Sequence, residues 1–244
     1  MKKTVLAILF ATVSLCSFSQ KITNIILVGP NGVTKDENEA HSYIIVKHHK
    51  DGHFERLDYN KGGPLKKLRT YRDTAMTVLE GDFYEYDKGG YLITAGRYKE
   101  NLKTGIWQTY TNKKLDTYVE YREDTIFRIL DKPMILTSTD ENDDTRAAIF
   151  PKGMSKWTDY LQRMIVRRNT VMKNKIGGKV ILNFTITTKG EIENVYLFKS
   201  VGYFIDEDAI EIIEKSPRWD AALIDGKRVD FEHQQSISFA VSRR

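Results

Sequence analysis

The sequence contains very little cysteine and proline. Its only cysteine is Cys16, and five prolines are spread over 244 residues. A single cysteine cannot form an intrachain disulfide, so a fold held together by disulfide bridges is excluded. So few prolines also exclude a long proline-rich spacer. If the N-terminal segment is removed, no cysteine remains, and a catalytic cysteine or a thiolate metal site is then excluded as well.

No apolar run is long enough to span a bilayer. Val5–Leu15 has eleven residues, whereas a membrane-spanning helix needs about 20. Lys2 and Lys3 precede the run, and Ser17-Phe18-Ser19 follows it with small residues at the two positions that a signal peptidase requires. We therefore predict a secretory signal over residues 1–19, cleaved after Ser19.

Two alternatives would keep the chain at a membrane. The signal could be retained as an anchor, or Cys16 could carry a lipid, although Leu15 stands where a lipoprotein signal favours a small residue. The cleaved form, exported and without disulfides, fits a bacterial periplasm. We predict a periplasmic protein that does not span a membrane once it is processed.

A strong excess of one charge is absent too. Removal of Lys2 and Lys3 lowers the formal net charge from +5 to +3, that is, 36 basic against 33 acidic residues. No dense basic stripe with interleaved aromatic residues appears, so no nucleic-acid partner is predicted. Hydrophobic residues make up 41% and charged residues 29%, which is typical of a globular protein.

The usual catalytic motifs are missing. The sequence has no Gly-x-Ser-x-Gly, no phosphate-binding Gly-Lys-Ser/Thr loop and no His-Glu-x-x-His. A hydrolase hidden in the N-terminal half would need clustered polar residues in a pocket, and the sequence shows no such cluster. We predict no enzyme activity and no cofactor.

Two groups of possible metal ligands lack suitable spacing. Adjacent His48 and His49 would point to opposite faces of a strand. Asp140, Asn142 and Asp144 start like a calcium loop, but Thr145 stands where glycine is required. The first group comprises His41, His48, His49 and His53. No metal is predicted.

The N-terminal half contains internal repeats. Tyr86–Leu92 echoes Tyr59–Leu65, and Gly81–Tyr86 matches Gly105–Tyr110 with a period of 24 residues. Paired glycines allow the chain to reverse between short strands, and alternating aromatic residues cover one face of a sheet. One hairpin is only marginally stable, so the units must stack side by side. We predict an antiparallel β array over residues 25–130.

These units resemble the MORN-like repeats of a bacterial family often described as antitoxin-type. Gly96-Arg-Tyr98 and Gly105–Tyr110 match that pattern well, whereas the third unit lacks turn glycines at Lys113-Lys114. The resemblance implies a fold and no particular activity.

The last hundred residues predict two helices and three strands. Trp157, Tyr160 and Leu161 follow Ser155, a candidate N-cap, at helical spacing. Two alternating strands flank a turn at Gly190. A second helix starts near Asp206-Glu207-Asp208, where the helix dipole favours anions. The tryptophans are expected to pack in the core. They are Trp107, Trp157 and Trp219.

A series of motifs runs in order through this half. They are Phe150–Gly153, Gly177–Val180, Lys189–Ile192, Val201-Gly202, Asp206–Ala209, Ser216–Trp219 and Gly226–Val229. Together they make residues 148–242 resemble the TonB C-terminal domain of Bacteroidetes-type energy transducers. Domains of that family bind a short segment of an outer-membrane receptor by strand addition, so the resemblance implies a protein or peptide partner.

The resemblance places the partner at a sheet edge close to the carboxyl end. An edge strand carries unpaired N–H and C=O groups that can receive an extended peptide. We expect the final strand to be this edge, with one set of residues sharing the same two-residue phase. These are Phe231, His233, Gln235, Ile237, Phe239 and Val241.

Three functions remain open at this point. The first is a periplasmic binding or adaptor protein. The second is a TonB-like energy-transducing component of outer-membrane transport, but a β array occupies the place of that family's proline-rich spacer. The third is a structural role in envelope assembly.

The sequence therefore predicts an α+β protein in four parts. They are a signal peptide at 1–19, a β-repeat domain at 20–136, a polar linker at 137–147 and a TonB C-terminal-like domain at 148–244. The last is expected to have two helices and a three-stranded antiparallel sheet.

Overall fold

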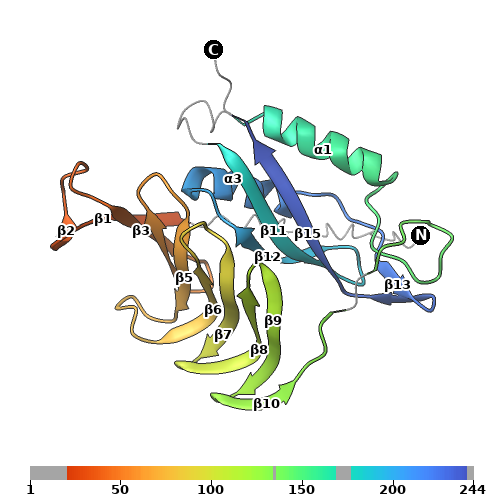
Figure 1. Cartoon of the computed structure of the whole chain (residues 1–244), viewed down its shortest axis with the longest axis horizontal. Coiled ribbons are helices and arrows are strands. Elements are labelled where there is room, and N and C mark those ends of the chain that lie inside the picture. The colour runs from red at the N-terminus through yellow and green to blue at the C-terminus, as the bar shows by residue number, and fades with distance from the viewer. Residues whose placement is uncertain (1–20, 134–135, 169–176, 241–244) are drawn as a thin grey trace, which may run out of the picture.

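The computed structural model describes residues 21–133, 136–168 and 177–240. A long antiparallel β array is followed by a smaller unit with two helices and a three-stranded sheet (Figure 1). This is the α+β class that the sequence predicts. The predicted signal segment, Cys16 and Val241 lie outside the described residues.

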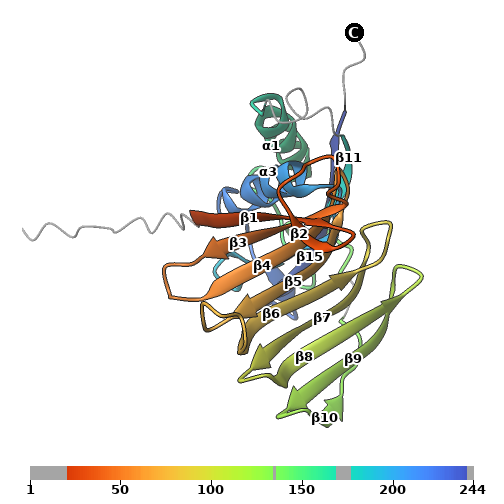
Figure 2. The same cartoon turned by 90° about the vertical axis from the view of Figure 1, so that its left-hand side faces the viewer.

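The array is one ten-stranded sheet in the order β10-β9-β8-β7-β6-β5-β4-β3-β1-β2, and all its pairings are antiparallel. Figure 2 shows its strands as successive rungs of a twisted ladder. Its strands are β1 (Lys21–Gly29), β2 (Gly32–Thr34), β3 (Ser42–His48), β4 (Phe54–Asn60), β5 (Leu65–Tyr71), β6 (Leu79–Tyr86), β7 (Leu92–Lys99), β8 (Leu102–Thr111), β9 (Lys114–Arg122) and β10 (Thr125–Ile129).

Residues with positive φ close the hairpins of the array. Gly52 and Gly90 have φ of 93° and 80°, as the turn signals in the sequence predict. The third repeat lacks turn glycines, and there Asn112 and Lys113 adopt φ of 51° and 65°. Two successive positive φ values are typical of the two-residue turns that match the twist of a hairpin. The repeat therefore keeps its hairpin without glycine.

Trp107 packs on a strand position that has no side chain. A Cβ atom placed on Gly96 of β7 would lie 2.2 Å from the indole of Trp107 on β8. The indole is 3% exposed and its N–H donates a hydrogen bond to the carbonyl of Arg97 at 3.2 Å. Rings of Phe83 and Tyr98 surround it. Gly96 is therefore required by close approach, and Trp107 is a core residue as predicted.

The C-terminal unit follows the predicted order of elements. Its sheet has the order β12-β11-β15, and helix α3 covers β11 and β12. The short hairpin β13–β14 was not predicted. The elements are α1 (Met154–Val166), β11 (Gly178–Ile186), β12 (Ile192–Lys199), α3 (Tyr203–Glu214), β13 (Ala222–Ile224), β14 (Lys227–Val229) and β15 (Phe231–Phe239).

Helix α1 begins earlier than the sequence suggests. Ser155 is not its N-cap, because the helix starts at Met154 and Gly153 occupies the cap position with φ of 89° and no side-chain hydrogen bond. A glycine adopts this left-handed geometry without steric cost. Ser155 instead lies exposed in the first turn.

One hydrophobic core joins the array to the C-terminal unit. Tyr59 and Leu65 of the array are fully buried in the same cluster as Ile205 and Ala209 of α3 and Leu182 of β11. The polar stretch 137–147 also contacts the C-terminal unit. Arg146 is buried and pairs with Leu223 of β13 through two backbone hydrogen bonds of 2.9 Å. The two halves therefore pack as one body, whatever their domain boundaries.

The Gly96 contact predicts a specific sensitivity. Gly96→Ala should lower the free energy of unfolding by about 1–3 kcal/mol, because the new methyl group displaces the buried indole of Trp107. Urea denaturation followed by tryptophan fluorescence measures this loss. Gly89→Ala is the matched control, since its Cβ would lie no closer than 3.3 Å to another residue. Equal stability of the two variants would contradict the packing described here.

Candidate functional site

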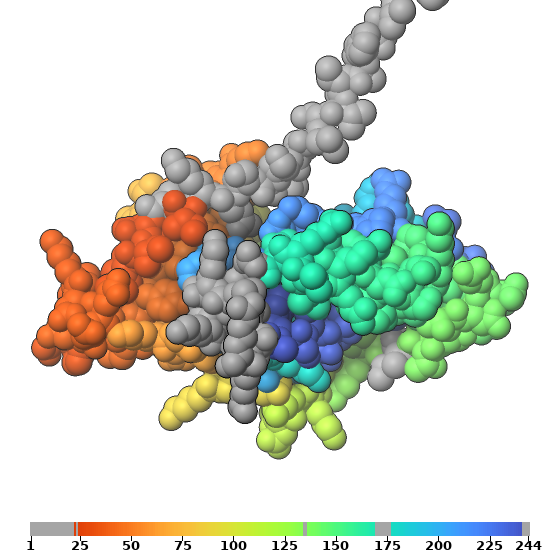
Figure 3. Space-filling model, turned by 90° about the horizontal axis from the view of Figure 1, so that it is seen from above, coloured from red at the N-terminus to blue at the C-terminus, as the bar shows by residue number. Residues whose placement is uncertain are grey.

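Strand β15 is an edge of the C-terminal sheet. It pairs with β11 along its whole length, from Gly178 opposite Phe239 to Ile186 opposite Phe231. Among the described residues, no other strand pairs with β15. In the space-filling view, the dark blue atoms of β15 lie at the surface beside α1 (Figure 3). The three-stranded layer with a free edge near the carboxyl end is thus present.

The turn after β11 shows which backbone groups of β15 point away from the sheet. The Thr187 N–H donates to Glu191 on the β12 side, and the Thr188 N–H donates to the Asp230 carboxylate on the β15 side. Backbone groups of successive strand residues point to alternate sides. The backbone N–H and C=O groups of Ile186 therefore point toward β15, and so do those of every second residue before it.

The unbroken register carries this alternation onto β15. The residues opposite Ile186, Phe184, Leu182 and Val180 turn their N–H and C=O groups toward β11. The intervening residues of β15 turn theirs toward the free edge. The four edge residues are Glu232, Gln234, Ser236 and Ser238.

The residues that the sequence predicts as the edge are instead those of β15 whose backbone groups point toward β11. Ile237 and Phe239 are 1% and 3% exposed and face the helices. Phe231, His233 and Gln235 are partly buried on the same face. Their side chains build the support of the edge, while edge donors and acceptors come from their neighbours.

Gln235 is one of two polar residues on the otherwise apolar face of β15. The indole N–H of Trp157 on α1 donates to the Gln235 side-chain carbonyl at 2.7 Å. The side-chain amide of Gln235 donates in turn to the backbone carbonyl of Ser236, also at 2.7 Å. Gln235 therefore satisfies a buried indole and already occupies one acceptor of the free edge.

His233 is the second polar residue on this face of β15. Its ring packs against Trp219 and Phe184, with ring centroids 5.5 and 5.2 Å away. Burial lowers the pKa of its imidazole, although a hydrogen bond that the ring donates to the Gln235 side chain acts in the opposite direction. His233 therefore serves as a flat, largely uncharged wall of the aromatic cluster under the sheet.

The outward side chains of β15 are short or polar. Glu232, Gln234, Ser236 and Ser238 are exposed, and the Gln234 amide donates to the Asn183 side chain of β11 at 2.9 Å. Neither proline nor lysine protects this edge, although both are common guards against unwanted strand pairing. Among the described residues, no strand pairs with this edge, and only the Ser236 carbonyl is occupied, by the Gln235 side chain.

Asp206 ties the sheet and α3 to the β array. Its carboxylate accepts hydrogen bonds from the hydroxyls of Tyr59 and Ser200 at 3.2 and 2.5 Å and from the Val201 N–H at 2.9 Å. Ser200 also accepts the N–H of Leu65 at 2.7 Å. This group, here named the Asp206 junction, therefore links β4, the start of β5, the end of β12 and α3.

The carboxyl group of Asp206 is fully buried. Burial raises its pKa to about 7, against the hydrogen bonds from Ser200, Val201 and Tyr59 that favour the charged form. The helix-start acid predicted from the sequence is therefore a junction residue within the first turn of α3. Nearby, Gly90 brings its carbonyl to the Ser200 N–H at 2.9 Å, and a Cβ atom there would lie 2.4 Å from the Ser200 carbonyl.

The other sequence candidates form no metal centre. No group of three or more histidine, cysteine or acidic residues in the described part of the chain is arranged to hold a metal ion. His48 stacks on Phe54 with centroids 4.5 Å apart, and His53 pairs with Asp51 at 3.2 Å. The Asp140 turn is held by its own hydrogen bond with Asn142. Among the described helices, none has the length and apolarity to cross a membrane.

Comparison with known families agrees with the geometry of the sheet. Residues 169–241 match the family described as Gram-negative bacterial TonB protein C-terminal. The C-terminal part of this chain is similar to that family. The match spans β11 to β15 with α3, begins after α1 rather than at residue 148, and covers less than a third of the chain.

This TonB C-terminal match supports a protein-interaction role in the periplasm of a Gram-negative bacterium. Nothing in it points to an enzyme. No curated protein and no solved structure matches the chain. The resemblance of the array to MORN-like repeats has no family match behind it and stays a prediction, as does the secretory signal.

The junction residues were missed by the sequence analysis. Tyr59 was recognised only as a repeat tyrosine, and Ser200 was not singled out. Their partner Asp206 lies 147 residues from Tyr59 along the chain, and no local pattern relates residues so far apart. The one available signal was an acidic residue amid the apolar stripe of α3.

The raised pKa of Asp206 predicts a pH-dependent stability. The folded state holds a proton that the unfolded state releases above its ordinary pKa of 3.8, so stability falls as pH rises from about 4 through 7. Asp206→Asn removes this titration. We expect the free energy of unfolding of the native protein to fall relative to that of the variant between pH 5 and 8 by on the order of 2–4 kcal/mol.

Urea denaturation at several pH values measures the difference. Asp140→Asn, at an exposed loop, is the control for loss of a carboxylate. Parallel pH profiles of the native protein and Asp206→Asn would contradict the assignment.

Proposed function

We propose that this protein is a periplasmic binding or adaptor protein that takes up an extended peptide on the free edge of β15. The observation that carries the proposal is the row of outward backbone groups at Glu232, Gln234, Ser236 and Ser238, on a strand that pairs only with β11 among the described residues. An incoming strand would pair with these groups and extend the sheet to four strands.

The similarity to the TonB C-terminal family supports the class of partner. We propose that the peptide is an extended periplasmic segment of an outer-membrane receptor. Its backbone would supply most of the affinity, and its alternate side chains would meet α1 on one face and the short polar side chains of β15 on the other.

The array bears on the choice between binding and energy transduction. The Tyr59–Asp206 hydrogen bond and the shared core hold the array against α3, whereas a transducer needs a spacer that reaches across the periplasm. The same family match keeps a role in transport open. We therefore favour an adaptor that presents the edge at a fixed orientation over a chain that transmits force.

Ser236→Pro tests the proposed edge. Proline removes the outward N–H of Ser236 without removing a bond to β11, and such a proline is tolerated on an edge strand. A photo-crosslinking amino acid at Ser238 should capture a receptor segment in native envelopes. We expect the Ser236→Pro background to reduce this crosslink at least about tenfold, because an edge hydrogen bond is lost and the proline ring obstructs pairing.

The same crosslinker at Glu37, exposed in the loop between β2 and β3 of the array, is the position control and should capture the segment poorly. An unchanged melting temperature shows that Ser236→Pro still folds. An equal yield of the crosslink from Ser238 with and without the proline would refute pairing at this edge.

A further inference from the structure

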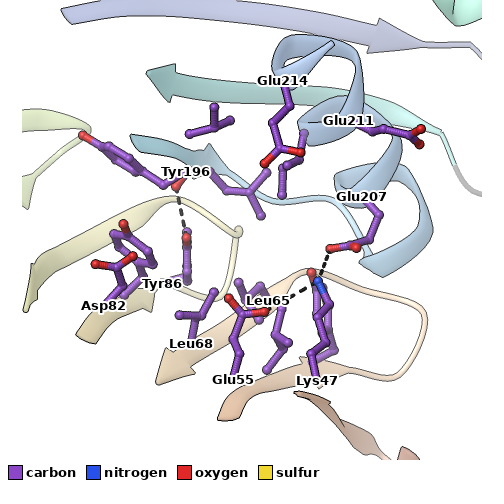
Figure 4. Close-up of a pocket in the computed structure, with 16 residues that line it drawn as sticks. Lys47, Glu55, Leu65, Leu68, Asp82, Tyr86, Tyr196, Glu207, Glu211 and Glu214 are labelled. Carbon is purple, nitrogen blue, oxygen red and sulfur yellow. Dashed lines mark hydrogen bonds and ion pairs between the residues drawn. The ribbon is translucent and has the colours of Figure 1, made fainter. Parts of the chain in front are cut away.

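A cleft runs between the inner face of the β array and the C-terminal unit. Its largest hollow has a volume of about 470 Å³ and lies between β3–β6, β12 and α3 (Figure 4). Two further hollows of about 290 and 420 Å³ adjoin it. All three share Asp82 as a wall residue, so they adjoin one another. The first two lie between the array and the C-terminal unit, and the third extends the cleft over the array alone.

The cleft already holds one lysine of the chain itself. Lys47 is 4% exposed. Its ammonium nitrogen lies 2.7 Å from the Glu207 carboxylate and 3.6 Å from that of Glu55. It also sits 5.6 Å from the ring centroid of Tyr203. Burial alone would lower the pKa of this ammonium, but the two carboxylates outweigh burial and raise it. Lys47 shows how the walls stabilise a buried cation.

Two other carboxylates of the cleft have no such counter-ion. Glu214 of α3 points into the largest hollow (Figure 4), and Glu232 of β15 lines the second. Neither side chain forms an ion pair or a hydrogen bond with another described residue, although the charge of Lys47 acts at a distance to favour the ionised form of Glu214. Both residues are exposed, and the partial desolvation of their carboxyl groups by the cleft walls raises the pKa of each. A cation between the walls would compensate them as Lys47 compensates Glu207.

Aromatic walls make the cleft suitable for organic cations. Tyr84 of β6 stacks on Tyr196 of β12 with centroids 5.2 Å apart, and both line the first and second hollows. Tyrosine rings pack against the aliphatic stems of lysine and arginine and attract their charged ends. At the far hollow, the His49 Nε2 atom is shielded from solvent and has no hydrogen-bond partner among the described residues.

We propose that this cleft binds a second partner segment, an extended peptide that carries lysine or arginine side chains. The elongated shape suits a chain rather than a compact ligand, and the uncompensated Glu214 and Glu232 lie in different hollows, as two spaced cations require. The site adjoins the β15 edge, with which it shares the side chain of Glu232, but it is otherwise formed by the array, α3 and the outward face of the small sheet.

Fluorescence anisotropy with a labelled nonapeptide of alternating lysine and serine tests the proposal. We expect saturable binding that the double variant Glu214→Gln/Glu232→Gln weakens at least about tenfold, since each charge-assisted contact contributes to affinity. The control Glu37→Gln/Glu141→Gln changes the net charge equally at exposed loops and should bind as the native protein does. A peptide with glutamine in place of lysine should not bind.

Several outcomes would overturn the proposal. These are no binding of the lysine peptide at low salt, an equal loss in both double variants, or displacement of the peptide by equimolar spermidine, which would assign the cleft to small polyamines. Ser236→Pro should bind the lysine peptide normally. A tenfold loss in Ser236→Pro would place the peptide on the β15 edge instead and would overturn a separate cleft site.

Discussion

The buried carboxyl group of Asp206 is the interaction on which the arrangement of this molecule depends. It lies where a strand of the repeat array, the end of β12 and the first turn of α3 meet, and it accepts hydrogen bonds from Tyr59 and Ser200. A buried acid left without these donors would be strongly destabilising. The polar junction therefore fixes one way of packing the two halves, while the surrounding apolar core supplies most of the stability.

This fixed packing explains why one face of the small sheet is protected and one edge is free. Helix α3, Trp157 and Trp219 cover the inner face. Tyr196 of the outer face stacks on Tyr84 of the array. The array thus occupies part of the outer face, while β15, at the opposite edge from β12, keeps one side unpaired among the described residues. The same packing creates the acidic cleft, which a C-terminal unit alone would not possess.

Much of the fold was predictable because local patterns determine it. Val180, Leu182, Phe184 and Ile186 alternate in the sequence and are all buried on one face of β11. The repeat period predicted the hairpin array, and the ordered motifs of the C-terminal half predicted its element order. These features depend on neighbours within a few residues or on one repeat.

The remainder depends on contacts between distant segments. The short β13–β14 hairpin lacks a long alternating pattern, and the start of α1 is set by the geometry of Gly153. The orientation of the edge was predictable only in part, since the phase of Phe231, Ile237 and Phe239 indicates a buried face but not which amides face outward. That assignment needs the hydrogen bonds of Thr187 and Thr188. The cleft could not be predicted, because Lys47 and Glu207 are 160 residues apart.

Amide hydrogen exchange of the free protein, resolved by residue, tests the central claim most directly. The account predicts alternation along β15, with slow exchange at His233, Gln235 and Ile237, whose N–H groups bond to β11, and fast exchange at Gln234, Ser236 and Ser238. Uniformly slow exchange along the strand would show that the edge is already paired, and the account of an open edge would then be wrong.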